Sequence, residues 1–70
     1  MKDYTVIVMA DYMIAYDYRL IDIAETFNYS ITQVYWALNY SLKHLDFNKY
    51  IECRDAMERH KHERWRRKNG

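Results

Sequence analysis

The sequence predicts an all-α fold, a small bundle of about four helices that contains a helix-turn-helix. Three observations favour this class. The chain of 70 residues has no proline and a single glycine at its end, so nothing in its interior breaks a helix. Apolar residues recur at intervals of three and four, which is the spacing of one face of a helix. Half of the residues are apolar, and the many aromatic ones supply the area that a short chain needs for a core.

The first helix is expected over residues 5–16, with Thr5 as its cap. Its apolar positions fall at helical spacing, and they are Val6, Met9, Ala10, Met13 and Ile14. Residues 4–9 also contain a β-branched run, so a short strand is the alternative for this segment. No second convincing strand exists to pair with it, and the helix is therefore favoured.

Residues 20–38 have the spacing of a helix-turn-helix. The first helix of the motif is expected over residues 19–26, where the small Ala24 leaves room for the second helix to cross. Larger apolar residues surround this position, namely Leu20, Ile23 and Phe27. The pattern therefore predicts that Ala24 marks the contact between the two helices.

The turn and the second helix carry their own signals. Asn28 is expected in a left-handed conformation, which asparagine tolerates better than most residues. Ser30 is the expected cap of the second helix, and Gln33 can reach back to it in a capping box. This helix is expected over residues 31–41, with three side chains turned inward: Val34, Ala37 and Leu38.

The last helix is expected to start after Asp46 as its cap. Before it, Leu42 and Leu45 continue the apolar face of the second motif helix through a looser connection. After it, one apolar stripe is expected to return to the core, formed by Phe47, Tyr50, Cys53, Met57 and His60. No domain boundary or low-complexity linker divides the chain, so residues 1–70 are expected to form one domain with a basic C-terminal tail at residues 59–70.

Charge is divided unevenly along the chain. Residues 1–58 hold five basic and nine acidic side chains, whereas residues 59–70 hold six basic and one acidic. A basic tail on a mildly acidic body favours phosphate binding, although a solvated, fraying terminus is the alternative. The tail also holds Trp65, which adds a stacking surface. The residues expected to contact the DNA backbone are Gln33, Arg59, Lys61, Arg64, Arg66, Arg67 and Lys68.

The outer face of the second motif helix is the candidate reading surface for a DNA major groove. Its expected members are Ser30, Ile31, Thr32, Tyr35, Trp36 and Asn39. Three of them, Ile31, Tyr35 and Trp36, are large and mostly apolar, where charged or amide side chains are usual. An exposed patch of this kind also suits a protein partner or a homodimer. The sequence therefore predicts a DNA-binding regulator, with a protein-interaction module as the alternative.

Other function classes find little support. Cys53 fits the core stripe better than a nucleophile's surroundings, and His60 and His62 lie on different faces of a helix. No glycine-rich loop can hold a nucleotide phosphate, and no metal-binding spacing occurs. We therefore expect no catalysis, metal, cofactor or small-molecule substrate. With no signal segment, no long apolar span and a single cysteine, a cytoplasmic protein without membrane contact is expected.

Over residues 12–67 the chain resembles, without a gap, the small sporulation transcription regulators of the stage III D type found in endospore-forming bacteria. The matching positions are Tyr12, Ala24, Phe27, Ser30, Val34, Leu38, Leu42, His60, Lys61, Arg64 and Arg67. The resemblance implies a bacterial DNA-binding regulator with a recognition helix in the major groove and a basic C-terminal segment on adjacent backbone or groove. It assigns Ser30, Thr32 and Asn39 to the reading surface, and Lys61, Arg64 and Arg67 to the basic segment.

Overall fold

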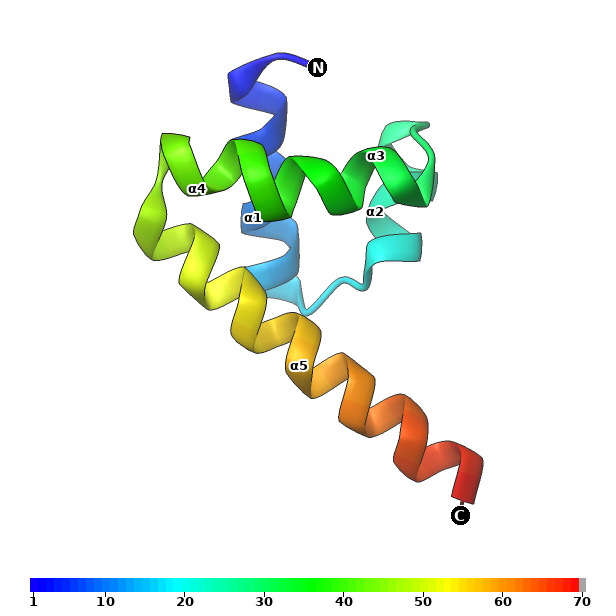
Figure 1. Ribbon diagram of the computed structural model, residues 1–70. Helices are drawn as coiled ribbons and strands as arrows, with labels where there is room; N and C mark the ends of the chain where they lie inside the picture. The colour runs from blue at the N-terminus through cyan, green and yellow to red at the C-terminus, as the bar shows by residue number, and fades with distance from the viewer. Residues whose placement is uncertain (70) are drawn as a thin grey trace.

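Four helical segments make up residues 1–69, the part of the chain whose backbone is described (Figure 1). The structure, a computed structural model, describes the backbone of residues 1–69 and the side chains of residues 1–62. Its elements are α1 (Asp3–Tyr16), α2 (Leu20–Phe27), α3 (Ile31–Trp36), the π-helical turn η1 (Ala37–Ser41), α4 (Leu42–Leu45) and α5 (Phe47–Asn69). α3, η1 and α4 follow one another without a break and form one rod. The predicted all-α bundle is confirmed, and the alternative strand at residues 4–9 is wrong because this segment is helical.

α1 begins at Asp3, two residues before the expected start. Thr5 is therefore inside the helix and does not cap it, contrary to the prediction. The first helical hydrogen bond runs from the Val6 amide to the Lys2 carbonyl oxygen, and the Asp3 carboxylate lies in the first turn, where the helix dipole favours a negative charge. The helix ends at Asp17, whose backbone is left-handed with φ 58°.

The core is built around α1, which packs against α2, the rod and α5. In Figure 1 the rod crosses α1, and α5 runs back beneath it. The fully buried side chains of α1 are Val6, Met9, Ala10 and Met13, and the other helices add Ile23, Val34, Leu38, Leu42, Cys53 and Ala56. None of the helices in residues 1–69 combines the length and the apolar character that a membrane span needs.

The π turn changes the expected course of the rod. The Leu42 amide donates to the Ala37 carbonyl oxygen, five residues back, so more residues fit into this turn and each rotates less around the axis. Leu42 is thereby brought to the core side, where it is fully buried with Val34 and Leu38. The looser connection predicted at Leu42 and Leu45 is wrong, since the rod stays helical through Leu45.

α5 starts as predicted, and four of its five predicted stripe residues lie against the core, namely the buried Cys53 and His60 and the half-buried Tyr50 and Met57. The Lys49 amide donates to Asp46 Oδ1 at 3.1 Å, which confirms Asp46 as the cap. Phe47 is 56% exposed, so its predicted place in the core is wrong; it lies about a third of a turn around the axis from the buried Cys53. The buried positions of α5 are Cys53, Ala56 and His60. Beyond His60 the helix extends away from the rest of the protein (Figure 1).

Candidate nucleic-acid interface

The turn between α2 and α3 has the conformation that the sequence predicts. α2 ends at Phe27, one residue later than expected, and Asn28 follows with φ 61° and ψ 45°. The next amide, that of Tyr29, donates to the Ala24 carbonyl oxygen at 2.9 Å and closes the end of the helix. The left-handed Asn28 is therefore confirmed, and it sets the direction in which the chain enters α3.

A reciprocal capping box fixes the start of α3. The Gln33 amide donates to Ser30 Oγ at 3.1 Å, and the Ser30 amide donates to Gln33 Oε1 at 2.9 Å. Both bonds agree with the prediction from the Ser-x-x-Gln spacing. The side-chain oxygen Oε1 of Gln33 is thus engaged in the cap, so this residue supports the start of the helix, and its contact with the DNA backbone stays a prediction.

The inner face of α3 is locked against α2. Ala24 is 4% exposed, and Ile23, Val34 and Leu38 are fully buried around it. A small side chain at the crossing lets the two helices approach, and the larger neighbours fill the space on either side. The packing predicted for a helix-turn-helix is therefore present.

The outer face of α3 is open along its length. Ser30 and Thr32 are exposed, and Ile31, Tyr35 and Trp36 are 47%, 43% and 51% exposed. These are five of the six side chains predicted to read DNA. Together they form a surface with hydroxyl groups at its start and apolar area beyond, which we call the outer face.

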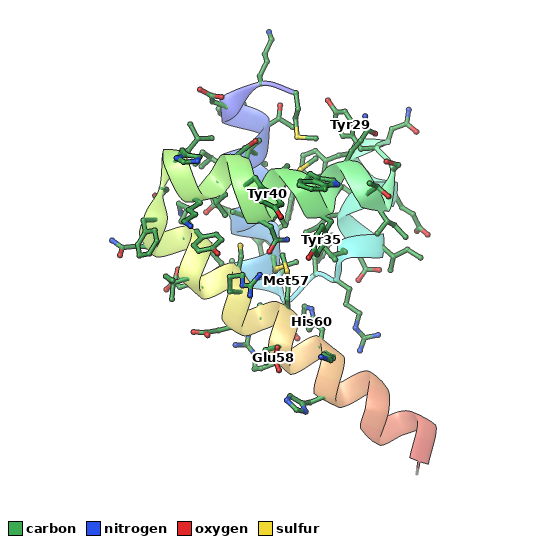
Figure 2. The ribbon with its side chains drawn as sticks, viewed as in Figure 1. Tyr29, Tyr35, Tyr40, Met57, Glu58 and His60 are labelled. Carbon is green, nitrogen blue, oxygen red and sulfur yellow. The ribbon has the colours of Figure 1, made fainter. Side chains whose placement is uncertain are left out.

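Tyr40 extends the outer face and was not predicted. Its ring lies 4.3 Å from that of Trp36, with 26° between the planes, and it is 53% exposed. Figure 2 shows Tyr35 and Tyr40 on this rod. The spacing of four residues between Trp36 and Tyr40 was the available signal, because such pairs meet on the surface of a helix. The stack holds the Trp36 ring in place without covering it.

Asn39, the sixth predicted reading residue, is a correction. It is only 6% exposed, because the π turn rotates it from the outer face toward α5. Its Nδ2 donates to the Tyr35 carbonyl oxygen at 2.7 Å, and its Oδ1 accepts from Arg54 Nη1 at 2.8 Å. Asn39 therefore joins the rod to α5, and it also brings the guanidinium of Arg54 beside the rod.

The predicted basic tail is the end of α5. Arg59 Nη2 lies 3.7 Å from Asp17 Oδ1, so this residue is paired within the protein, whereas Lys61 is exposed. The other predicted members lie in the helical backbone, and their side chains are outside the described residues: Arg64, Arg66, Arg67 and Lys68, with Trp65 among them. The tail thus continues from the body as a helix.

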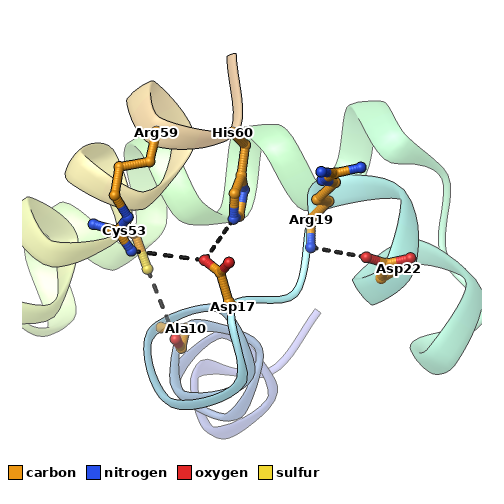
Figure 3. Close-up of polar contacts among 7 residues, drawn as sticks. All are labelled: Ala10, Asp17, Arg19, Asp22, Cys53, Arg59 and His60. Atoms are coloured by element: carbon orange, nitrogen blue, oxygen red, sulfur yellow. Dashed lines mark hydrogen bonds and ion pairs between the residues drawn. The ribbon is translucent and has the colours of Figure 1, made fainter. Parts of the chain in front are cut away.

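A contact at His60 holds α5 to the end of α1 (Figure 3). His60 Nε2 donates to Asp17 Oδ1 at 2.7 Å, and the imidazole is only 10% exposed. The hydrogen bond from His60, with the positive charges of His60 and Arg59, lowers the pKa of the Asp17 carboxyl from its ordinary value of 3.8. His60 is thus a structural residue at the point where α5 leaves the body.

Cys53 does not have the surroundings of a catalytic thiol. It is fully buried, and its Sγ donates to the Ala10 carbonyl oxygen at 3.8 Å. Burial raises the pKa of the thiol to about 12, so the nucleophilic thiolate is not formed near neutral pH. Within the part of the chain that the structure describes, no three His, Cys, Asp or Glu side chains come together as a metal site would require.

Comparison with known proteins adds no relative to this description. No protein-family model matches the sequence, and the searches of curated proteins and of solved structures give no significant match. The resemblance to the stage III D type regulators therefore stays a prediction.

Proposed function

We propose that this protein binds double-stranded DNA as a small transcriptional regulator, with α3 in the major groove. The observation that carries the proposal is the contrast within the helix-turn-helix. The inner face of α3 is fixed to α2 by packing, by the left-handed Asn28 and by the capping box, while its outer face is open. A rigid second helix with one accessible face is what the motif uses to reach base edges.

The charge of α5 supports the same proposal. Six of the eleven basic side chains of the protein lie in residues 59–70, on a helix that extends beyond the body. Such a segment can bind phosphates and release counterions, which supplies affinity without reading sequence. Since Arg59 is paired with Asp17, we expect the main phosphate contacts to come from Lys61 and the basic residues after it.

The family resemblance narrows the proposal further. It favours a regulator of sporulation genes in an endospore-forming bacterium, acting in the cytoplasm, where the bacterial chromosome lies. The hydroxyls of Ser30 and Thr32 would then face base edges at the start of α3, as the resemblance assigns them. Asn39 is not part of this proposal, since it is engaged with Tyr35 and Arg54.

The test is a titration of the full chain with random-sequence duplex DNA at several salt concentrations. About five phosphate contacts predict that the logarithm of the affinity falls with the logarithm of the salt concentration at a slope of about −4 to −5. The Arg66→Gln, Arg67→Gln double variant should reduce this slope by about 2. A flat salt response of the unaltered protein would contradict the proposal.

A matched control removes two charges elsewhere. Lys2 and Lys43 are exposed on the body, so the Lys2→Gln, Lys43→Gln variant loses the same charge outside the tail. Its slope should stay close to that of the unaltered protein. Substitution is preferred to truncation at residue 58, because truncation would also remove His60 and its contact with Asp17.

A protein-interaction module is the second candidate. The stack of Trp36 on Tyr40 favours it, because a rigid, exposed aromatic pair is typical of interface hot spots. In that case Trp36→Ala should weaken self-association or partner binding by about 2 kcal/mol or more with the fold intact. Sedimentation of the unaltered protein and of Trp36→Ala over a range of concentrations separates the two candidate functions. A DNA-binding monomer would sediment identically with and without the Trp36 ring.

A further inference from the structure

The outer face lacks the side chains that distinguish most bases. Arginine and lysine recognise guanine, asparagine and glutamine recognise adenine, and acidic residues recognise cytosine. The outer face as defined above includes none of these types, since Asn39 is buried between the rod and α5, and the exposed Gln33 is not a member and directs its Oε1 to the Ser30 amide. Hydrogen bonding to bases by the outer face is therefore limited to hydroxyl groups and the Trp36 indole N–H, and none of these singles out guanine, adenine or cytosine.

The apolar groups of the outer face suit a different target. Thymine is the one base whose major-groove edge carries a methyl group, and apolar side chains recognise it by contact. Ile31, Tyr35 and Trp36 each leave about half of their surface open, and Thr32 adds a methyl group on the same face. Removing such area from water on binding a methyl group is favourable without any hydrogen bond.

The stacking of Trp36 on Tyr40 preorganises this surface for binding. The Trp36 ring is held 4.3 Å from the Tyr40 ring, so less side-chain freedom is lost when the ring meets a base pair. Tyr35 also lies edge-on to Trp36, at 6.4 Å and 89°. The three rings thus form a fixed apolar surface, in contrast to the flexible long side chains that commonly read DNA.

We propose that α3 recognises thymine methyl groups in the major groove, so that the preferred duplexes place thymines opposite Ile31, Thr32, Tyr35 and Trp36. This inference rests on the proposed function. Duplex DNA is the occupant to which the proposal commits, because the positively charged end of α5 complements its phosphates while the body is acidic.

Deoxyuridine gives a direct test, because it differs from thymidine only in the missing methyl group. The full-length protein is titrated with an alternating A·T duplex about two helical turns long and with its A·U counterpart. Binding to the A·U duplex should be weaker by about fourfold for each methyl group contacted. In a G·C duplex, replacing cytosine by 5-methylcytosine should raise the affinity by a similar factor.

Variants show whether the outer face is responsible. Ile31→Ala and Trp36→Ala should each reduce the preference for the A·T over the A·U duplex. Phe47→Ala is the matched control, since it removes an equally exposed aromatic ring at the start of α5, and it should keep the preference. Far-UV circular dichroism checks that all three variants are folded.

The possible results separate the inference from the proposed function. Salt-dependent binding with equal affinity for the two duplexes would overturn methyl recognition and leave DNA binding intact. A preference that persists in both Ile31→Ala and Trp36→Ala would assign it to another part of the protein, and would also overturn the inference. No binding to either duplex at low salt would overturn the proposed function together with the inference.

Discussion

The two faces of the rod segment formed by α3 and η1 are alike in composition and opposite in their surroundings. Val34 and Leu38 on the inner face are fully buried against the other helices, whereas Ile31 and Trp36 on the outer face are about half exposed. Both sets are large and apolar, so hydropathy alone does not tell them apart. What distinguishes them is whether another helix covers them, and this is decided by the whole fold. An apolar surface that the fold leaves open is a candidate for a partner.

The largest effect on stability is expected when one large apolar residue of each face is replaced by alanine. Leu38→Ala should lower the free energy of unfolding by about 3 kcal/mol, because it leaves a cavity in a packed core. Trp36→Ala should cost about 1 kcal/mol or less, which corresponds to the loss of its stack on Tyr40. Urea unfolding followed by circular dichroism measures both. Equal losses would show that the outer face is packed, and would remove the contrast on which the proposed function depends.

A smaller loss of stability is expected at Asn39, which lies between the outer and inner faces of the rod. Asn39→Ala removes the acceptor for Arg54 and the donor to the Tyr35 carbonyl oxygen, and should cost about 1 to 2 kcal/mol of stability. Thr32→Ala is the control on the open face and should cost far less. If Asn39→Ala leaves stability unchanged but abolishes DNA binding, the side chain reads bases as the sequence predicted.

Local rules explain which parts of this molecule could be predicted. The left-handed Asn28, the Ser30–Gln33 box and the Asp46 cap each depend on residues within four positions, and all three are present. Predictions that carried helical periodicity across a longer stretch failed at Asn39 and Phe47. The π turn has no short sequence signature, and it shifts the positions of the rod that follow Trp36 around its axis, including Asn39. Phe47 belongs to the separate helix α5, where it lies at the edge of the predicted stripe.

The candidate site was predictable only in part for the same reason. Ser30, Ile31 and Trp36 lie on the outer face because they come before the π turn, where periodicity still holds. The pairing of Arg59 with Asp17 joins residues distant in the sequence and has no local signal. Whether the apolar outer face meets DNA or protein cannot be read from residue types that serve equally well in a core.

The capping box should contribute about 1 kcal/mol to the free energy of unfolding, because it stabilises the start of α3 as a whole. Ser30→Ala removes the side chain that accepts from the Gln33 amide and should destabilise the protein by about that amount. Ser30→Asp, which can also cap a helix, should keep the stability but repel phosphates. The pair of variants, measured by thermal unfolding and by DNA titration, separates the structural role of Ser30 from contact with DNA. Equal DNA affinities for the aspartate variant and the unaltered protein would show that Ser30 does not lie close to the DNA.

The smallest effect on stability is expected from the contact between Asp17 and His60, which lies where the extended end of α5 leaves the packed body. The pKa of Asp17 is lowered mainly by the hydrogen bond from His60, so the folded state favours the charged carboxylate. The resulting stability is present at pH values above 3.8 and is lost as the pH falls through the lower pKa of the folded state.

The variant Asp17→Asn removes this titration, and asparagine still tolerates the left-handed backbone at φ 58°. Unfolding measured from neutral to acid pH should therefore depend less steeply on pH in Asp17→Asn, whereas Asp55→Asn, an exposed carboxylate of α5, should keep the steeper dependence. Identical acid profiles for Asp17→Asn and the unaltered protein would mean that the His60 contact does not hold α5 to α1 in solution. The direction in which the basic end of α5 leaves the body would then be set by its other contacts, which include the core packing of Cys53 and Ala56 and the hydrogen bond from Arg54 to Asn39.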